Sequence, residues 1–265
     1  MLRIFLRKAR SVSCNPIVTP APLTKQITAF LLDIEGTTTP IDFVYEVLFP
    51  YARTHVRAYL ADHLSSEEHR SDIASLLEEN AVDARSGLNP PLIERPDEHI
   101  SIDKIVAYVH WLMDRDRKTT ALKSIQGKVW DEGYQKGELH SQVFEDVPRA
   151  FARWQQRGRA ICIYSSGSVL AQRLLFAFTE AGDLTTFISG FFDTNIGPKR
   201  EAESYRRIAS ELKLPADEIV FVSDVTAELD AAASAGFQTL LCVRPGNSDQ
   251  PAAAHLAIHG FDQIP

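Results

Sequence analysis

The sequence has few cysteines, and the three that it has, Cys14, Cys162 and Cys242, lie far apart and form no CxxC pair. This usage argues against a disulfide-stabilised fold and against a cysteine zinc site, and it favours a reducing compartment. The histidines show no HExxH or other metal-ligand spacing. No apolar run reaches the roughly 18–20 residues that a membrane-spanning helix needs. We therefore expect a cytoplasmic protein with no membrane partner.

Basic residues are outnumbered by acidic ones, 28 Lys and Arg against 35 Asp and Glu. The formal net charge is -7, and no stretch interleaves basic with aromatic residues, so we expect no nucleic-acid partner. Residues 1–26 are the exception, because they contain basic residues and no acidic one. We interpret this segment as a disordered tail, and an acid-poor organelle-targeting peptide within residues 1–24 stays open as the alternative.

The first half of the chain is predicted to be mostly helical. Its 265 residues suffice for one large domain or for a core with a smaller second domain. Apolar periodicity and helix breakers predict helices over 41–60, 67–80, 102–117 and 119–139, a kink or break at Pro50, and a loop over 81–100. About a hundred residues thus separate the first buried strand from the next, which predicts an inserted helical cap over residues 41–145.

The second half alternates between strands and helices. After the apolar run that begins at Ile27, the pattern predicts strands over 160–164, 218–223 and 238–243, an extended segment over 187–193, and helices between them. This alternation predicts an α/β fold with a doubly wound parallel sheet that is covered on both faces. We assign residues 27–40 and 146–265 to this core.

The first strand ends abruptly in polar residues, beginning with Asp33 and Glu35. The carboxyl ends of strands are where open α/β sheets bind ligands. Two neighbouring carboxylates repel each other and are costly to bury, so they persist where a cation or a reaction uses them. Taken alone, the segment could equally be a solvated acidic turn.

Further polar residues follow the later strands or precede the later helices: Ser165, Ser166, Lys199, Asp224 and Glu228. Each has a plain structural alternative, namely a helix cap for the serines and Asp224, a solvated loop charge for Lys199, and a first-turn dipole contact for Glu228. Parallel strands end at one edge of a sheet, so these residues can converge there. Carboxylates suit Mg²⁺, hydroxyls and free N–H groups suit phosphate, a lysine offsets charge, and an aspartate can attack phosphorus.

Five motifs together resemble one known family. They are Asp33 to Ile41, Tyr164 to Ser168, Glu203 to Arg206, Asp224 to Thr226, and Arg244 to Asn247. This pattern resembles the enolase-phosphatases of the methionine salvage pathway, a branch of the haloacid dehalogenase-like (HAD-like) phosphotransferases. The resemblance runs from about Ile27 to the C-terminus. It implies a Rossmann-like core of the HAD type with a cap.

The resemblance also implies roles for the polar residues. Asp33 would be the nucleophile and a Mg²⁺ ligand, and Glu35 would be a second metal contact and the candidate general acid/base, through its side chain or its carbonyl. Asp224 would complete a site for one Mg²⁺ per subunit, with Glu228 lying farther out. Ser165, Ser166 and Lys199 would bind the substrate phosphate.

The implied activity has two steps. A monomeric enzyme would enolise 2,3-diketo-5-methylthiopentyl-1-phosphate and then remove phosphate to give the acireductone. Phe43, Tyr45 and Phe49 either shape a pocket for the thioether tail or pack in the core, which we favour. Four alternatives stay open: a HAD-like phosphatase for another small phosphate ester, a phosphomutase, a dehalogenase, which the metal-type residues disfavour, and a non-catalytic scaffold.

Overall fold

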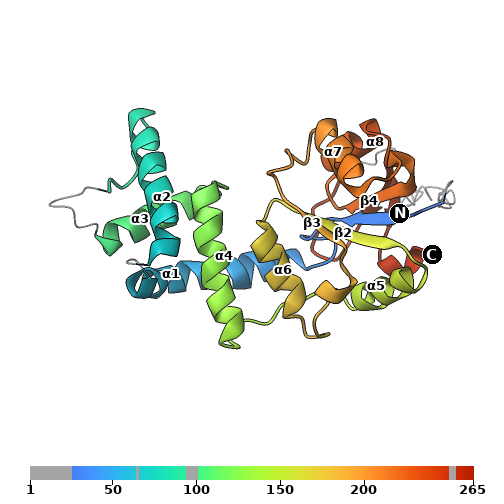
Figure 1. Ribbon diagram of the computed structural model, residues 1–265, viewed down its shortest axis with the longest axis horizontal. Helices are drawn as coiled ribbons and strands as arrows, with labels where there is room; N and C mark the ends of the chain where they lie inside the picture. Colours follow the sequence, from blue (N-terminus) through green and yellow to red (C-terminus); the bar gives the residue numbers. More distant parts are fainter. Residues whose placement is uncertain (1–25, 64–65, 94–100, 251–254) are drawn as a thin grey trace, which may run out of the picture.

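The computed structural model describes residues 26–63, 66–93, 101–250 and 255–265, and Figure 1 shows their arrangement. The predicted tail, residues 1–26, lies outside the described residues except for its last one. Helices α1 to α4 gather on one side, and the sheet with the remaining helices lies on the other (Figure 1). Within the described residues, no helix is both long and apolar enough to cross a membrane.

A parallel sheet forms the centre of the core, with the strand order β3-β2-β1-β4-β5-β6. The strands are β1 (Ala29–Leu32), β2 (Ala160–Tyr164), β3 (Gly190–Phe192), β4 (Ile219–Ser223), β5 (Gln238–Cys242) and β6 (Leu256–Ile258). The strand β1 is central and lies between β2 and β4. The predicted doubly wound α/β fold is confirmed.

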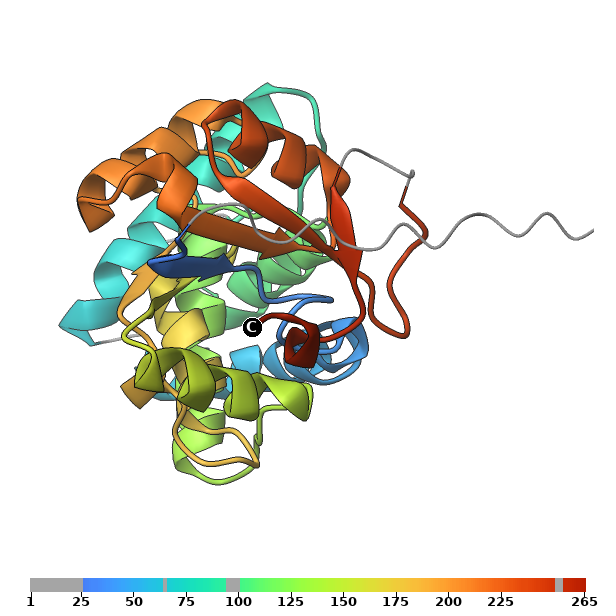
Figure 2. The same cartoon turned by 90° about the vertical axis from the view of Figure 1, so that its right-hand side faces the viewer.

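The helices of the core cover both faces of this sheet (Figure 2). They are α5 (Asp146–Gln156), α6 (Val169–Ala177), α7 (Ala202–Leu212) and α8 (Thr226–Ser234). Side chains of β1 alternate between the faces, as a strand requires. Phe30 packs on the α5 side, where its ring stacks on Trp154 with 3.9 Å between centroids, and Leu31 packs on the α7 and α8 side.

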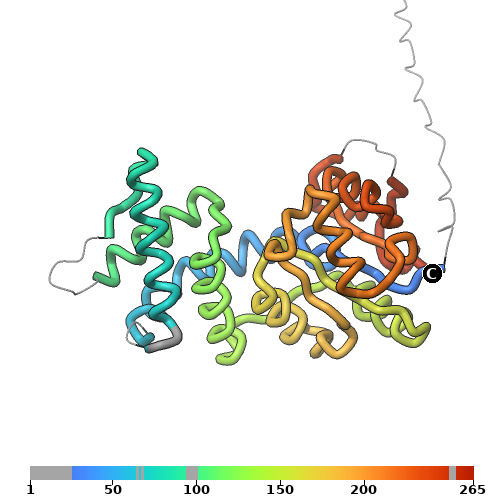
Figure 3. The backbone as a smooth tube through the Cα atoms, turned by 45° about the horizontal axis from the view of Figure 1, so that its top comes forward, coloured from blue at the N-terminus to red at the C-terminus, as the bar shows by residue number. Residues whose placement is uncertain are grey.

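Four further α-helices and a π-helix occupy the segment between β1 and α5. They are the π-helix Phe43–Leu48, α1 (Phe49–His63), α2 (Glu67–Arg85), α3 (Ile102–Met113) and α4 (Thr120–Gln135). The chain enters this part after β1 and leaves it before α5, as the tube in Figure 3 shows. Short 3-10 turns cover Thr185–Phe187, Ala216–Glu218 and Phe261–Gln263. The assignment of residues 41–145 to a separate cap domain stays a prediction.

The break predicted at Pro50 coincides with a change of helix type: the π-helix ends at Leu48 and α1 begins at Phe49, so Pro50 occupies the first turn of α1, where Pro is well tolerated. Two other local features differ from the sequence-based expectation. The helix α2 runs to Arg85 into the predicted loop, and its residue Asp83 accepts a hydrogen bond from the Tyr108 hydroxyl of α3 at 2.8 Å. The strand β6 has only three residues, too few to show a periodic pattern.

Candidate active site

Asp33 directly follows β1 and is 2% exposed. Its Oδ1 accepts the backbone N–H of Ile34 at 2.8 Å, and the hydroxyl of Ser223 lies 2.9 Å from its Oδ2. The Thr38 hydroxyl donates to the Asp33 carbonyl at 3.0 Å. Local turn contacts and the neighbouring strand β4 therefore fix the orientation of this carboxylate.

Lys199 lies in the loop before α7, and its side chain is only 9% exposed. Its Nζ is 2.6 Å from Asp33 Oδ1 and 2.6 Å from Glu228 Oε2. Burial by itself would lower the pKa of Lys199, but the charges of Asp33 and Glu228 raise it above the ordinary value. Lys199 is therefore a buried cation that joins two carboxylates and not a solvated loop charge.

Asp224 and Glu228 bring two more carboxylates to the same edge of the sheet. A Cβ added at Gly36 would lie 2.5 Å from Asp224 Oδ2, so this carboxylate packs directly against the turn after β1. The N-cap position of α8 is Val225, so Asp224 stands one residue before the cap. Burial and the charge of Asp33 raise the pKa of both Asp224 and Glu228 to about 7.

Gly36 itself is required at this turn for two reasons. Its φ of +68° is in the left-handed region that side chains disfavour. Its missing Cβ also leaves the space that the Asp224 carboxylate occupies. The glycine of the motif thus allows the acidic ends of β1 and β4 to approach each other.

The serine pair lies between β2 and α6. Ser165 is 1% exposed, and its Oγ accepts the backbone N–H of Gly167 at 3.1 Å. The cap of α6 is Ser168, whose Oγ accepts from Ala171 N at 3.3 Å. The capping alternative for Ser165 and Ser166 is therefore wrong, and the pair stands just before a capped helix N-terminus, a position suited to an anion.

The acidic set fits a divalent cation. Lys199 is the buried cation in contact with Asp33 and Glu228, while Asp224 and Glu35 add two further carboxylates, and the pKa of Glu35 is raised by burial and by Asp33. Among the described residues, no group of three or more His, Cys, Asp or Glu side chains is arranged so that it could hold a metal ion by itself. Mg²⁺ needs no such cage, because it binds through one or two carboxylates and keeps several waters.

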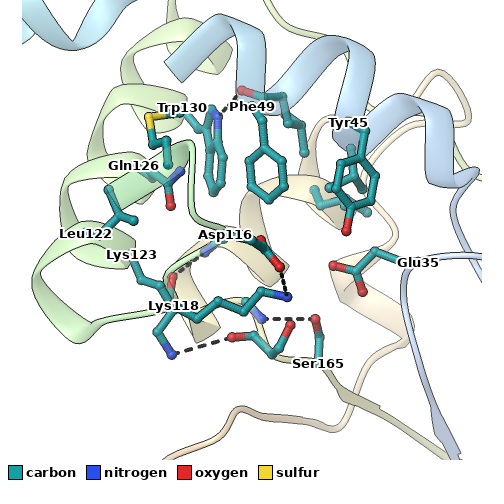
Figure 4. A pocket seen from close by; sticks show the side chains of 18 of the residues that line it. Glu35, Tyr45, Phe49, Asp116, Lys118, Leu122, Lys123, Gln126, Trp130 and Ser165 are labelled. Atoms are coloured by element: carbon teal, nitrogen blue, oxygen red, sulfur yellow. Dashed lines mark hydrogen bonds and ion pairs between the residues drawn. The ribbon is translucent and has the colours of Figure 1, made fainter. Parts of the chain in front are cut away.

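A cavity of about 400 Å³ lies between the core and the helices α1 and α4, and of this charged set only Glu35 lines it. Figure 4 shows the Glu35 carboxylate pointing into it. Ser165 and Ser166 line the same cavity. Apolar side chains form much of the remaining wall, among them Phe49, Leu122 and Trp130.

The three aromatic residues weighed for this pocket divide into two groups. Tyr45 and Phe49 line the cavity, and their rings meet edge to face at 5.4 Å. Phe43 is 2% exposed and belongs to the hydrophobic core. The prediction of core packing is thus confirmed for Phe43. Tyr45, in contrast, is 53% exposed and lines the cavity.

The turn from Arg244 to Asn247, one of the five motifs of the resemblance, contacts the loop that follows Asp33. The Arg244 guanidinium donates to the Thr37 carbonyl at 3.2 and 3.3 Å and to Asp146 Oδ1 at 2.9 Å. Asn247 Nδ2 donates to the Gly36 carbonyl at 2.9 Å. A buried arginine beside glycine and asparagine gives no signal for such a long-range contact.

Replacing Arg244 with methionine is expected to destabilise the protein by about 3–5 kcal/mol, because Asp146 would stay buried without its cation. Urea unfolding followed by circular dichroism measures this change. Arg206→Met is the matched control, since Arg206 makes an exposed pair with Glu203 and should change stability by less than about 1 kcal/mol. Equal stability of the two variants would contradict a structural role for the Arg244 pair.

Comparison with known proteins adds independent information. Residues 27–236 match the family model described as haloacid dehalogenase-like hydrolase. Enolase-phosphatase E1 of Synechococcus elongatus is 51% identical over 245 residues, which cover 92% of this chain and 100% of that protein. The Drosophila melanogaster protein of the same name is 42% identical, covering 89% of each chain. Among solved structures, the UTR4 protein of Saccharomyces cerevisiae aligns with a TM-score of 0.72 and 32% identity, covering 90% of this chain and 100% of that one.

Proposed function

The chain belongs to the haloacid dehalogenase-like hydrolases and, within them, to the enolase-phosphatases, and from this we propose how the residues around Asp33 perform the reaction. The enzyme is an acireductone synthase of methionine salvage. It enolises the diketone phosphate ester and then hydrolyses the phosphate. The observation that carries the assignment of roles is the buried contact of Asp33 with Lys199, together with the packing of Asp224 against the turn after β1.

The homologues imply a divalent metal, and we take it to be Mg²⁺. Asp33 and Asp224 would hold it, with Glu35 as a further contact through its carbonyl or side chain. When bound, the ion would offset the excess of carboxylates and polarise the carbonyl and phosphoryl oxygens of the substrate. One ion per subunit would suffice for this charge balance.

Asp33 then acts as the nucleophile of phosphate removal. A carboxylate oxygen of Asp33 bonds to phosphorus while the bond from phosphorus to the substrate oxygen breaks, which gives an aspartyl-phosphate. Water hydrolyses this intermediate and regenerates the carboxylate. The hydroxyl of Ser165 and the N–H group of Ser166 hold the phosphate oxygens, and Lys199 offsets the charge that develops.

Glu35 is the candidate acid/base for enolisation because it is the carboxylate of the site that lines the cavity. It would take the proton from the carbon that carries the phosphate ester, next to the carbonyl, and leave an enolate, whose oxygen takes a proton from water to give the enol. In the second step it would return a proton to the departing oxygen. Such general acid/base assistance contributes roughly 10²–10⁴-fold to rate.

The apolar wall of the cavity fits the rest of the substrate. Phe49 and Trp130 line it, and their ring centroids lie 6.1 Å apart. A methylthio tail is an apolar and polarisable group that packs well against aromatic rings. The cap side of the cavity would then recognise the tail, and the core side would react with the phosphate end.

A two-channel assay tests this function. Purified protein is mixed with the diketone phosphate and Mg²⁺, ultraviolet absorbance follows the enediol product, and a colorimetric assay follows phosphate. We expect both signals to rise and a chelator to stop both. Phosphate release from other esters alone would leave the HAD-like site in place but would contradict the enolase step.

Shortening Glu35 to aspartate is expected to slow enolisation by about tenfold or more, because the carboxylate retreats from the cavity by one methylene. Phosphate release from p-nitrophenyl phosphate, which has no proton to abstract, should fall clearly less. The ratio of the two rates is the measurement. Glu46→Asp is the control, since Glu46 is exposed and does not line the cavity. Equal losses of rate in both assays would contradict a specific role of Glu35 in enolisation.

Three broader expectations remain proposals. The helices between β1 and α5 act as a cap that closes over the site and excludes water. The enzyme works as a monomer on a small phosphate ester. It is located in the cytoplasm, and a targeting role for residues 1–24 remains the alternative.

A further inference from the structure

The basic residues of the cavity differ in their partners. Among the described residues, three of the four arginines and lysines that line it pair with carboxylates: Arg53 with Asp114 at 2.8 Å, Arg117 with Glu79 and Asp83 at 3.1 and 3.2 Å, and Lys118 with Asp116 at 3.7 Å. Figure 4 shows the last of these pairs. The fourth, Lys123 of α4, forms no such ion pair in the part of the chain that the structure describes.

Lys123 instead contacts neutral oxygens of the core. Its Nζ lies 3.2 Å from the Thr194 hydroxyl and 3.5 Å from the Ser166 carbonyl. The side chain is half-buried and lines the cavity beside Ser166 and Gly167. An ammonium group of the cap therefore stands next to the loop whose hydroxyl and N–H groups suit a phosphate.

The charge of Lys123, and not that of Lys199, favours an anion at this position. Lys199 already contacts two carboxylates, Asp33 and Glu228, so its charge is largely offset before substrate arrives. A phosphate monoester is close to a dianion at neutral pH. A half-buried ammonium whose contacts are with neutral oxygens gains a stronger, charge-assisted partner when such a group binds.

We propose that Lys123 binds the substrate phosphate and supplies, from the cap, a second cation to the site formed by Ser165 and Ser166. This inference rests on the proposed function for the identity of the phosphate ester. It has a structural consequence, since one anion would then join helix α4 of the cap to the core. Phosphate affinity would depend on a residue outside the core motifs.

Titration calorimetry with inorganic phosphate in the presence of Mg²⁺ tests the proposal on the full chain. Lys123→Met and Lys123→Gln are expected to weaken phosphate binding by about tenfold, the loss of one charge-assisted hydrogen bond. Lys123→Arg keeps the charge and should bind within about threefold of the original protein. Lys136→Met is the matched control, because Lys136 ends the same helix, pairs with Glu132 at 2.9 Å and lies outside the cavity.

A merely structural tie between α4 and the core predicts a different pattern. Thr194→Val removes the shorter contact of Lys123 but leaves its charge, so phosphate affinity should stay within about threefold of the original. The proposal is overturned if both neutral variants bind phosphate as tightly as the original protein, or if Thr194→Val loses as much affinity as Lys123→Met. The titration uses inorganic phosphate and no diketone, so its result does not depend on the two-channel assay. If that assay failed, the proposed function would be contradicted, but phosphate binding by Lys123 would still be tested.

Discussion

Asp33→Asn is expected to abolish turnover, with a loss of about 10⁴-fold or more, the scale seen when a nucleophile is removed. The amide cannot attack phosphorus to form an aspartyl-phosphate, and it also removes one proposed metal contact. Phosphate release and enediol formation should therefore both disappear in the two-channel assay. The fold should survive, because Lys199 keeps its contact with Glu228 at 2.6 Å.

Asp42→Asn is the matched control, since Asp42 is exposed and lies outside the cavity. It should retain full activity. Turnover by Asp33→Asn above about one hundredth of the original would contradict nucleophilic catalysis by this residue. The scaffold alternative makes the opposite prediction, because a binding role would be unaffected by the same substitution.

Lys199→Met is expected to remove both activity and stability. The substitution leaves Asp33 and Glu228 buried without their cation, and breaking a buried pair in this way costs about 3–5 kcal/mol. The remaining carboxylates, Asp33 and Glu228, would then repel each other. We expect a decrease in turnover of about 10³-fold, similar to the loss of one electrostatic contact in other transition states.

Chemical denaturation and the two-channel assay together measure these effects. Lys104→Met serves as the control, since Lys104 is exposed on α3 and does not line the cavity. A stable Lys199→Met protein with near-normal turnover would exclude Lys199 from both proposed roles. A stable protein without turnover would keep the catalytic role and exclude the structural one.

The convergence of the polar residues was predicted from local sequence patterns, namely the short apolar strands that precede them. The run before Asp33 and the strands before Ser165 and Asp224 are short and apolar, so their ends could be placed within the sequence. Since the strands are parallel, those ends had to meet at one edge of the sheet. The helices that cover the sheet followed from the same alternation.

Predictions were wrong where a short element or a distant contact decided the outcome. The three residues of β6 carry no period, and the extension of α2 is accompanied by the contact of Asp83 with Tyr108. The serine that caps α6 could not be chosen in advance, because Ser165, Ser166 and Ser168 are chemically equivalent and only the backbone path selects Ser168.

The sequence alone therefore determined the fold class, the edge at which the site forms and the residue types gathered there, because strand pattern and strand ends are local properties. The tertiary structure decided which of those residues touch: Lys199 with Asp33 and Glu228, and Arg244 with Asp146 and the loop after β1. It also placed the ammonium of Lys123 beside Ser166. These contacts join residues tens to hundreds of positions apart, and packing of the whole chain, not any local pattern, brings them within a few ångströms.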